Sequence, residues 1–190
     1  MNASDFEQYD GLIFDCDGTL ADSMPVHYLA WRETLLRYGI DFAEDRFYSM
    51  GGMPSAMIVK LLSAEQGADP DPVTVAEEKE DLFQTLIDQV RPKQAVCDLA
   101  IAFHGRKPMA VASGSGRVVV IKQLEALKIH DLFPVVVTAE DTQRHKPEPD
   151  VFLEAADRIG VRPEACVVFE DSPLGFQAAE AAGMAWVDVR

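Results

Sequence analysis

The sequence has few cysteines, few basic residues and no long apolar segment, and each of these shortages argues against a class of protein. Among its 190 residues there are only three cysteines, Cys16, Cys97 and Cys166, and their spacing matches no zinc-binding pattern. Cys16 and Cys166 lie in apolar segments typical of strands, where a buried free thiol is the simpler interpretation. We therefore expect a reduced protein without disulfides, as is typical of the cytoplasm.

Long apolar segments are also missing. No apolar run approaches the roughly 18 residues that a membrane-spanning helix requires. The first residues, MNASDFEQYDG, are acidic and contain no apolar core of the kind found in secretory signals. We expect a cytoplasmic protein that has no membrane partner.

Basic residues are scarce. The chain has 17 Lys and Arg against 32 Asp and Glu, which gives a formal net charge of −15. A surface this acidic repels nucleic acids and anionic membranes. A small anionic substrate is still compatible with it if a metal ion or a few well-placed basic side chains hold that substrate. We expect a monomer with no nucleic-acid partner.

Short apolar segments recur along the chain. They cover residues 11–15, 108–113, 134–140, 166–171 and 185–189 and are rich in Val, Ile, Phe and Ala. Each of the first four ends in a polar or acidic residue. Continuous apolar runs of this length are typical of parallel strands that are buried on both faces.

Helical segments alternate with the last four of these strands. They cover residues 116–128, 149–159 and 172–182. The second and third have proline in the first turn, and Gly160 and Gly183 directly follow them, an asymmetry typical of helix ends. The alternation predicts an α/β fold built on a doubly wound, Rossmann-like parallel sheet.

A long insert separates the first strand from the second. It reads as helical, with Tyr28, Trp31, Leu35 and Tyr38 on one face and a second amphipathic stretch at 76–90. We predict two domains: a core of residues 1–23 and 91–190, and a small helical cap of residues 24–90.

Polar side chains follow the predicted strands at the edge where parallel sheets bind ligands. They are Asp15 and Asp17, Ser113, Lys146, and Glu170 with Asp171. Two close carboxylates repel each other unless a cation lies between them or one is protonated. The pattern favours a cation site over a merely solvated strand end. Taken singly, Ser113 is equally compatible with a helix cap, and Lys146 with a solvated loop.

Two other motifs are weaker. Gly114, Ser115 and Gly116 follow a strand and open a helix, but position 119 is valine where a dinucleotide-binding loop has its third glycine. The pair Asp15 and Asp17 does not start a calcium loop, because position 19 is threonine and no glutamate stands at the twelfth place.

Four motifs together resemble a known family. They are FDCDGTLADS at 14–23, VASGS at 111–115, HKPEPD at 145–150 and VVFEDSPLG at 167–175. The sequence resembles the haloacid dehalogenase superfamily, and within it the phosphatases and mutases similar to β-phosphoglucomutase. The resemblance covers essentially the whole chain, including the insert.

The resemblance implies a covalent phosphotransfer mechanism. Asp15 would attack phosphorus and form an aspartyl phosphate. Asp17 would protonate the leaving alcohol and later deprotonate the attacking water. Ser113 and the Gly114 amide would bind phosphoryl oxygens, and Lys146 would balance the charge of the nucleophile and the phosphate.

The resemblance also implies a metal site and cap contacts. Mg²⁺ would be held by the Asp15 carboxylate, the Asp17 main-chain carbonyl and Asp171, with Glu170 as an additional ligand. His27 and Lys79 match cap positions that lie near the substrate in relatives. As lone residues, both are equally compatible with surface or helix-packing positions.

The function expected from the resemblance is a magnesium-dependent phosphatase for a small phosphorylated metabolite, a sugar phosphate of the fructose-1-phosphate or 6-phosphogluconate type. A phosphosugar mutase is the alternative. Mutase-type relatives bind the second phosphate with an arginine in the cap turn, where this chain has Ser55. Arg117 could replace it in part. A non-catalytic domain is the third possibility, but it would be expected to lack at least one of the catalytic side chains.

Overall fold

The computed structural model of the chain describes residues 1–51 and 53–190. Gly52, which belongs to the cap turn considered above, lies outside the described residues. The chain forms two compact units, one of residues 1–22 and 90–190 and one of residues 23–89. Each unit has its own secondary structure and apolar core.

The first unit is built on a five-stranded parallel sheet. Its strands are β1 (Gly11–Phe14), β4 (Met109–Ala112), β5 (Val135–Val137), β6 (Cys166–Glu170) and β7 (Ala185–Asp188). Their order in the sheet is β5-β4-β1-β6-β7. The chain runs outward from β1 in one direction and then returns to extend the sheet on the other side. The predicted doubly wound sheet is therefore confirmed.

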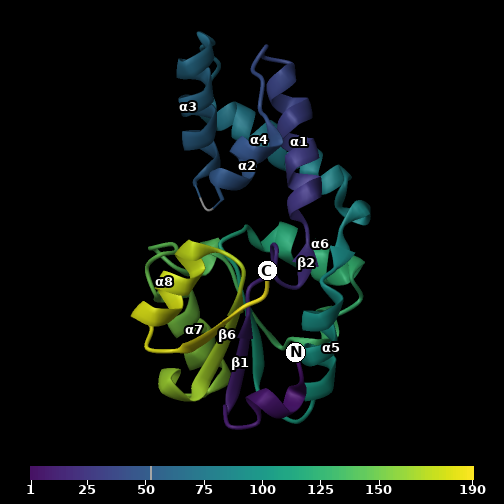
Figure 1. Cartoon of the computed structure of the whole chain (residues 1–190), viewed down its shortest axis with the longest axis vertical. Helices are drawn as coiled ribbons and strands as arrows, with labels where there is room; N and C mark the ends of the chain where they lie inside the picture. Colours follow the sequence, from purple (N-terminus) through teal and green to yellow (C-terminus); the bar gives the residue numbers. More distant parts are fainter. Residues whose placement is uncertain (52) are drawn as a thin grey trace. The chain divides into compact units, whose positions relative to one another are not determined.

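Helices cover both faces of this sheet. They are α5 (Gln94–Phe103), α6 (Arg117–Ala126), α7 (Asp150–Ile159) and α8 (Pro173–Ala181). Figure 1 shows α7 and α8 on one side of the sheet and α5 on the other. Short 3₁₀ turns complete the unit: η1 (Ala3–Phe6), η3 (His130–Leu132), η4 (Ala139–Asp141) and η5 (Pro163–Ala165). One apolar cluster, which includes Ile13, Ala110, Phe152, Val168 and Ala178, joins the sheet to α7 and α8.

The register of the sheet aligns the ends of its central strands. Phe14 at the end of β1 stands opposite Val111 of β4 and Phe169 of β6. The residues that follow these three positions therefore emerge at the same edge of the sheet. This is the edge where the sequence analysis expects the functional side chains.

Local signals explain most of the boundaries. The Ser172 side chain accepts a hydrogen bond from the Gly175 amide at 3.0 Å and so caps α8, and Gly160 ends α7 in the left-handed conformation. The predicted strand at 134–140 is too long. It stops at Val137 because the Asp141 carboxylate accepts a hydrogen bond from the Thr138 amide at 2.8 Å, which turns the chain into η4.

Three elements of the first unit were not predicted, one helix and two short strands. Helix α5 precedes β4, and a two-stranded antiparallel ladder joins β2 (Ala21–Asp22) to β3 (Arg91–Pro92). These short strands lie at the two places where the chain leaves and re-enters the first unit. Each of these strands is only two residues long, and so short a segment shows no apolar pattern from which a strand could be recognised in the sequence.

The second unit is entirely helical. It contains α1 (Met24–Leu36), α2 (Glu44–Ser49), α3 (Ser55–Gln66), α4 (Pro72–Thr85) and η2 (Ile87–Gln89). Its core includes Trp31, Leu35, Phe42, Phe47, Val59 and Leu62. Helix α4 begins before the predicted position 76, because Asp71 caps it by accepting from the Thr74 amide at 2.8 Å. The role of this unit as a cap stays a prediction. Among residues 1–51 and 53–190, no helix has both the length and the apolar character to cross a membrane.

Candidate active site

Three carboxylates meet at the carboxyl edge of the sheet. Asp15 directly follows β1, Glu170 is the last residue of β6, and Asp171 comes next in the chain. One oxygen from each of the three lies within 4.8 Å of the others. The aligned ends of β1 and β6 are the reason for this convergence.

Lys146 bridges two of these acids. Its Nζ donates to Asp15 Oδ1 at 2.8 Å and to Glu170 Oε1 at 2.7 Å. The exposed fractions of the three side chains are 11% for Lys146, 7% for Asp15 and 1% for Glu170, so water screens these contacts little. The ammonium also lies 4.8 Å from the centre of the Phe152 ring. Lys146 is therefore a largely buried partner of these acids and not a solvated loop residue.

The Glu170 carboxylate is held on both of its oxygens. Oε1 binds Lys146, while Oε2 accepts from the backbone amides of Asp171 and Ser172, both at 2.6 Å. The first turn of α8 packs directly on this carboxylate, because a β carbon on Gly175 would lie 1.9 Å from Oε1. Glycine is thus required at position 175 by close approach.

Burial and mutual repulsion raise the pKa values of Asp15 and Asp171. Burial raises the pKa of Asp15 well above its usual range, and the neighbouring Glu170 and Asp171 add to this effect against the opposing attraction of Lys146. Burial, followed by the charge of Glu170, raises the pKa of Asp171 to about 6. For Lys146, desolvation alone would lower the pKa, but Asp15 and Glu170 outweigh it and raise the pKa overall.

This charge balance fits a bound cation. Three carboxylates face one ammonium, so the ionised cluster carries excess negative charge in a buried place. A divalent cation would relieve the repulsion that raises the two pKa values. Carboxylate oxygens are also the ligands that Mg²⁺ and Ca²⁺ prefer. The residues present therefore fit a hard divalent metal ion.

The Asp17 carboxylate is bound away from this cluster. Ser115 Oγ donates to Asp17 Oδ2 at 2.6 Å, and Gln123 Nε2 donates to Asp17 Oδ1 at 2.9 Å. Ser115 was noted from the sequence only as part of the VASGS motif and its loop, and Gln123 was not singled out. The one available signal was a glutamine in the apolar face of the predicted helix at 116–128.

Ser113 and Gly114 follow β4 at the same edge. Ser113 is 1% exposed, and its Oγ accepts from the Ser115 amide at 3.0 Å. The N-cap residue of α6 is Gly116, so the alternative of Ser113 as the helix cap is wrong. Gly114 is exposed, and no heavy atom lies within 4 Å of where its β carbon would be. The backbone here has room for a ligand.

His27 and Lys79 contact each other in the second unit. Lys79 Nζ lies 2.9 Å from His27 Nδ1 and 5.4 Å from the ring centres of Trp31 and Phe83. The His27 ring stacks on Phe83 with centroids 3.7 Å apart, and Lys79 is only 4% exposed. A buried ammonium beside an imidazole and two aromatic rings is a packed arrangement, and its contact with a substrate stays a prediction.

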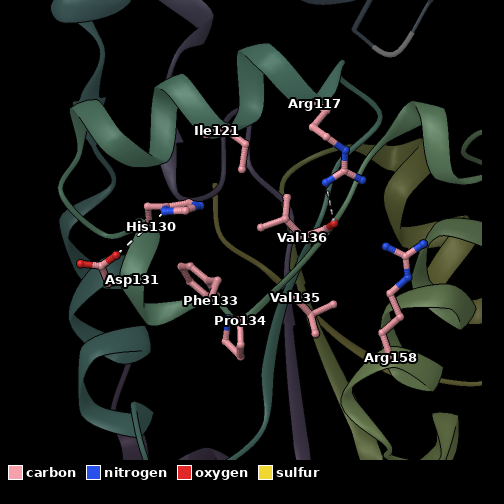
Figure 2. Close-up of a pocket in the computed structure, with 9 residues that line it drawn as sticks. All are labelled: Arg117, Ile121, His130, Asp131, Phe133, Pro134, Val135, Val136 and Arg158. Atoms are coloured by element: carbon pink, nitrogen blue, oxygen red, sulfur yellow. Dashed lines mark hydrogen bonds and ion pairs between the residues drawn. The ribbon is translucent and has the colours of Figure 1, made fainter.

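A separate hollow of about 540 Å³ runs along the edge strand β5 (Figure 2). Its lining includes Arg117, His130, Phe133, Val136 and Arg158. Arg117 donates to the Val136 carbonyl at 3.4 Å and forms an ion pair with Asp141. Arg117, which the sequence offered as a possible ligand of a second phosphate, lines this hollow, whereas none of the residues expected at the catalytic, metal or cap positions does. The acidic cluster lies elsewhere in the unit.

Comparison with known proteins identifies the family. A sequence model of the haloacid dehalogenase-like hydrolases matches residues 12–189. The chain is 44% identical to the fructose-1-phosphate phosphatase YqaB of Escherichia coli, over 97% of this chain and 98% of that protein. It is 28% identical to the phosphorylated carbohydrates phosphatase of Thermotoga maritima, over 92% and 82%. The β-phosphoglucomutase of Clostridium difficile has a similar structure, with a TM-score of 0.79 and 27% identity, over 95% of this chain and 84% of that chain.

The chain belongs to the haloacid dehalogenase-like hydrolase family. The resemblance seen in its four motifs is thereby confirmed. The prediction of a phosphatase of this family, a phosphoric monoester hydrolase, is confirmed at the level of enzyme class by the family match and the phosphatase relatives.

Proposed function

We propose that this enzyme is a magnesium-dependent phosphatase for a small sugar phosphate of the fructose-1-phosphate type, and that Asp15 is its covalent nucleophile. The observation that carries the proposal is the contact of Lys146 with both Asp15 and Glu170, next to Asp171. This arrangement places a carboxylate oxygen at a strand end beside an ammonium that can offset the charge of a phosphate. The relative YqaB is named a fructose-1-phosphate phosphatase, and this name supports the proposed substrate class.

In the first half of the reaction, an Asp15 carboxylate oxygen attacks phosphorus. The new bond joins Asp15 to phosphorus while the bond from phosphorus to the sugar oxygen breaks. Asp17 gives its proton to that sugar oxygen, which leaves as an alcohol. Ser113 and the Gly114 amide bind the phosphoryl oxygens, and Lys146 offsets the negative charge that gathers around Asp15.

In the second half, a water oxygen attacks the same phosphorus. Asp17, now ionised, takes a proton from this water, and the bond between Asp15 and phosphorus breaks. Inorganic phosphate leaves and the Asp15 carboxylate is regenerated. The acid of the first half is therefore the base of the second, and its proton is restored at each turnover.

Asp15, Asp171 and the Asp17 main-chain carbonyl would hold Mg²⁺, with Glu170 as an additional ligand. When bound, the ion supplies positive charge against the phosphoryl oxygens and the nucleophile. That charge would reduce the repulsion between the Asp15 carboxylate and the anionic phosphate.

The arginines favour a phosphatase over a mutase. A mutase must hold the far phosphate of a bisphosphate, a task suited to a guanidinium. Arg117 is engaged by Val136 and Asp141 on the β5 side, and Arg46 pairs with Glu65 at 2.7 Å within the second unit. Ser55, at the start of α3, carries no charge. A weakly held bisphosphate would leave the aspartyl phosphate open to water.

A panel of phosphorylated metabolites tests this proposal. We expect magnesium-dependent phosphate release from fructose 1-phosphate or 6-phosphogluconate, and none from the Asp15→Asn variant or after removal of metal with EDTA. With β-glucose 1-phosphate and a trace of the 1,6-bisphosphate, we expect little isomerisation. Accumulation of glucose 6-phosphate faster than phosphate release would instead establish the mutase alternative.

A further inference from the structure

Gln123 is a polar residue in an otherwise apolar buried face of α6. The other buried side chains of this helix are Val119, Val120 and Leu124, and Gln123 is fully buried with them. Burying an amide is unfavourable unless its polar atoms find partners. Within the described part of the chain, Gln123 Oε1 has no hydrogen-bond partner. The donor nitrogen is therefore the atom through which this side chain makes its specific contact.

That nitrogen contacts the candidate acid and base. Gln123 Nε2 donates to Asp17 Oδ1 at 2.9 Å, and Ser115 Oγ donates to Asp17 Oδ2 at 2.6 Å. With a donor on each oxygen, a rotation of the carboxylate about its Cβ–Cγ bond would break both hydrogen bonds. Ser115 belongs to a loop, whereas Gln123 lies within α6. The more rigid of the two anchors is thus the glutamine.

We propose that Gln123 is a positioning residue for proton transfer, which holds the Asp17 carboxyl in the plane from which it serves the leaving oxygen and the attacking water. This inference rests on the proposed function and deepens it, because Gln123 acts through Asp17 and not on the substrate. An uncharged donor suits the task. A glutamate at position 123 would repel Asp17. A leucine or methionine would fill the same space but could not donate a hydrogen bond to the Asp17 carboxyl.

Proton transfer depends steeply on orientation, so a loosened Asp17 should slow the step without weakening substrate binding. The variant Gln123→Met removes the donor but keeps the length of the side chain in an apolar place. Leu124→Met is the matched control, since Leu124 is equally buried on the same helix and the substitution conserves volume.

The experiment compares kcat and KM of these variants with a sugar phosphate and with 4-nitrophenyl phosphate, whose leaving group needs no proton. For Gln123→Met we expect kcat/KM for the sugar phosphate to fall roughly tenfold through kcat, with KM unchanged, and kcat/KM for the nitrophenyl ester to fall much less. Leu124→Met should stay near wild type on both substrates. In the Asp17→Asn background, Gln123→Met should cause no further loss.

Three results would overturn the inference. The first is an equal loss in Gln123→Met and Leu124→Met, and the second is a rise in KM with unchanged kcat. The third is a loss from Gln123→Met that adds fully to that of Asp17→Asn, since Gln123 would then not act through Asp17. If the wild-type enzyme releases no phosphate from the panel, or if Asp17→Asn is fully active, the proposed function fails and the inference with it.

Discussion

Gly18 and Asp171 approach so closely that a β carbon on Gly18 would lie 2.1 Å from Asp171 Oδ2. Gly18 also has a φ of +82°, a conformation that residues with a β carbon adopt at a cost. The turn after Asp17 thus brings the backbone against a candidate metal ligand, and only glycine leaves that ligand in place.

The variant Gly18→Ala should therefore lose turnover for two reasons, a displaced Asp171 and a strained turn. We expect phosphate release to fall by about a hundredfold or more, as for other misplaced catalytic groups. Phosphate release and urea unfolding, measured on the same samples, separate activity from stability.

Gly160→Ala is the matched control. Gly160 has a φ of +71°, and nothing lies within 4 Å of where its β carbon would be, so this variant carries the backbone strain alone. It should be less stable than wild type by roughly 1–2 kcal/mol and keep its activity. If Gly18→Ala lost no more activity than Gly160→Ala, the close approach of Gly18 to Asp171 would not be needed for activity.

Lys146→Met should destabilise the enzyme as well as inactivate it. Without the ammonium, three largely buried carboxylates face one another, and Asp15 and Glu170 lose the ion pairs that Lys146 makes with them. Breaking a buried ion pair in this way costs roughly 3–5 kcal/mol. Chemical unfolding in EDTA at neutral pH should show this loss, and the exposed Lys60→Met should not.

The difference between Lys146→Met and wild type should shrink as the pH falls, because protonated carboxyls no longer need the ammonium. A loss of stability that is equal at neutral and acidic pH would mean that Lys146 stabilises the fold through packing, for instance on Phe152, and not through its charge.

The convergence of the acids at one edge of the sheet could be predicted from the sequence, because it follows from the topology of a parallel sheet. The acids after β1 and β6 converge because these strands pair in register, and the cap Ser172 fixes the start of the helix that packs on Glu170. Such signals are local: an apolar run, a polar residue at its end, a proline and a glycine. They place each element within a few residues.

Contacts set by tertiary packing could not be predicted in the same way. The bond from Gln123 to Asp17 joins residues 106 positions apart, and nothing near Gln123 in the sequence indicates which way its amide points. The contact between His27 and Lys79 is similar, since it depends on how α1 packs on α4. Arg117 was considered as a phosphate ligand, but Asp141 and the Val136 carbonyl hold it at β5.

Asp141 should make stability depend on pH. Burial alone would raise the pKa of this carboxyl, but hydrogen bonds from the Thr138 amide and from Arg158, together with the charge of Arg117, lower the pKa below its ordinary value of 3.8. A group with a lowered folded-state pKa contributes stability above its unfolded-state pKa, and that stability disappears as the pH falls through the folded-state value.

Asp141→Asn should therefore be less stable than wild type near neutral pH, by on the order of 1–2 kcal/mol. The difference should shrink once the pH falls below about 4. Urea unfolding across this pH range checks it, with the exposed Asp157→Asn as control. A difference that grows on acidification would have the wrong sign for this account.

The central claim, that Asp15 carries the phosphoryl group, is tested most directly by trapping the phosphorylated enzyme. The Asp17→Asn variant suits this, because a nitrophenolate leaves without a proton while hydrolysis of the aspartyl phosphate still needs a base. Incubation of this variant with magnesium and ³²P-labelled 4-nitrophenyl phosphate should thus load the nucleophile and leave it loaded. After an acid quench, the label is followed through proteolysis.

The account predicts label in near-stoichiometric amounts on the peptide that contains Asp15, released by hydroxylamine as expected for an acyl phosphate, and no label in the Asp15→Asn, Asp17→Asn double variant. Phosphate release with no labelled protein at any time, or label on a residue other than Asp15, would contradict it.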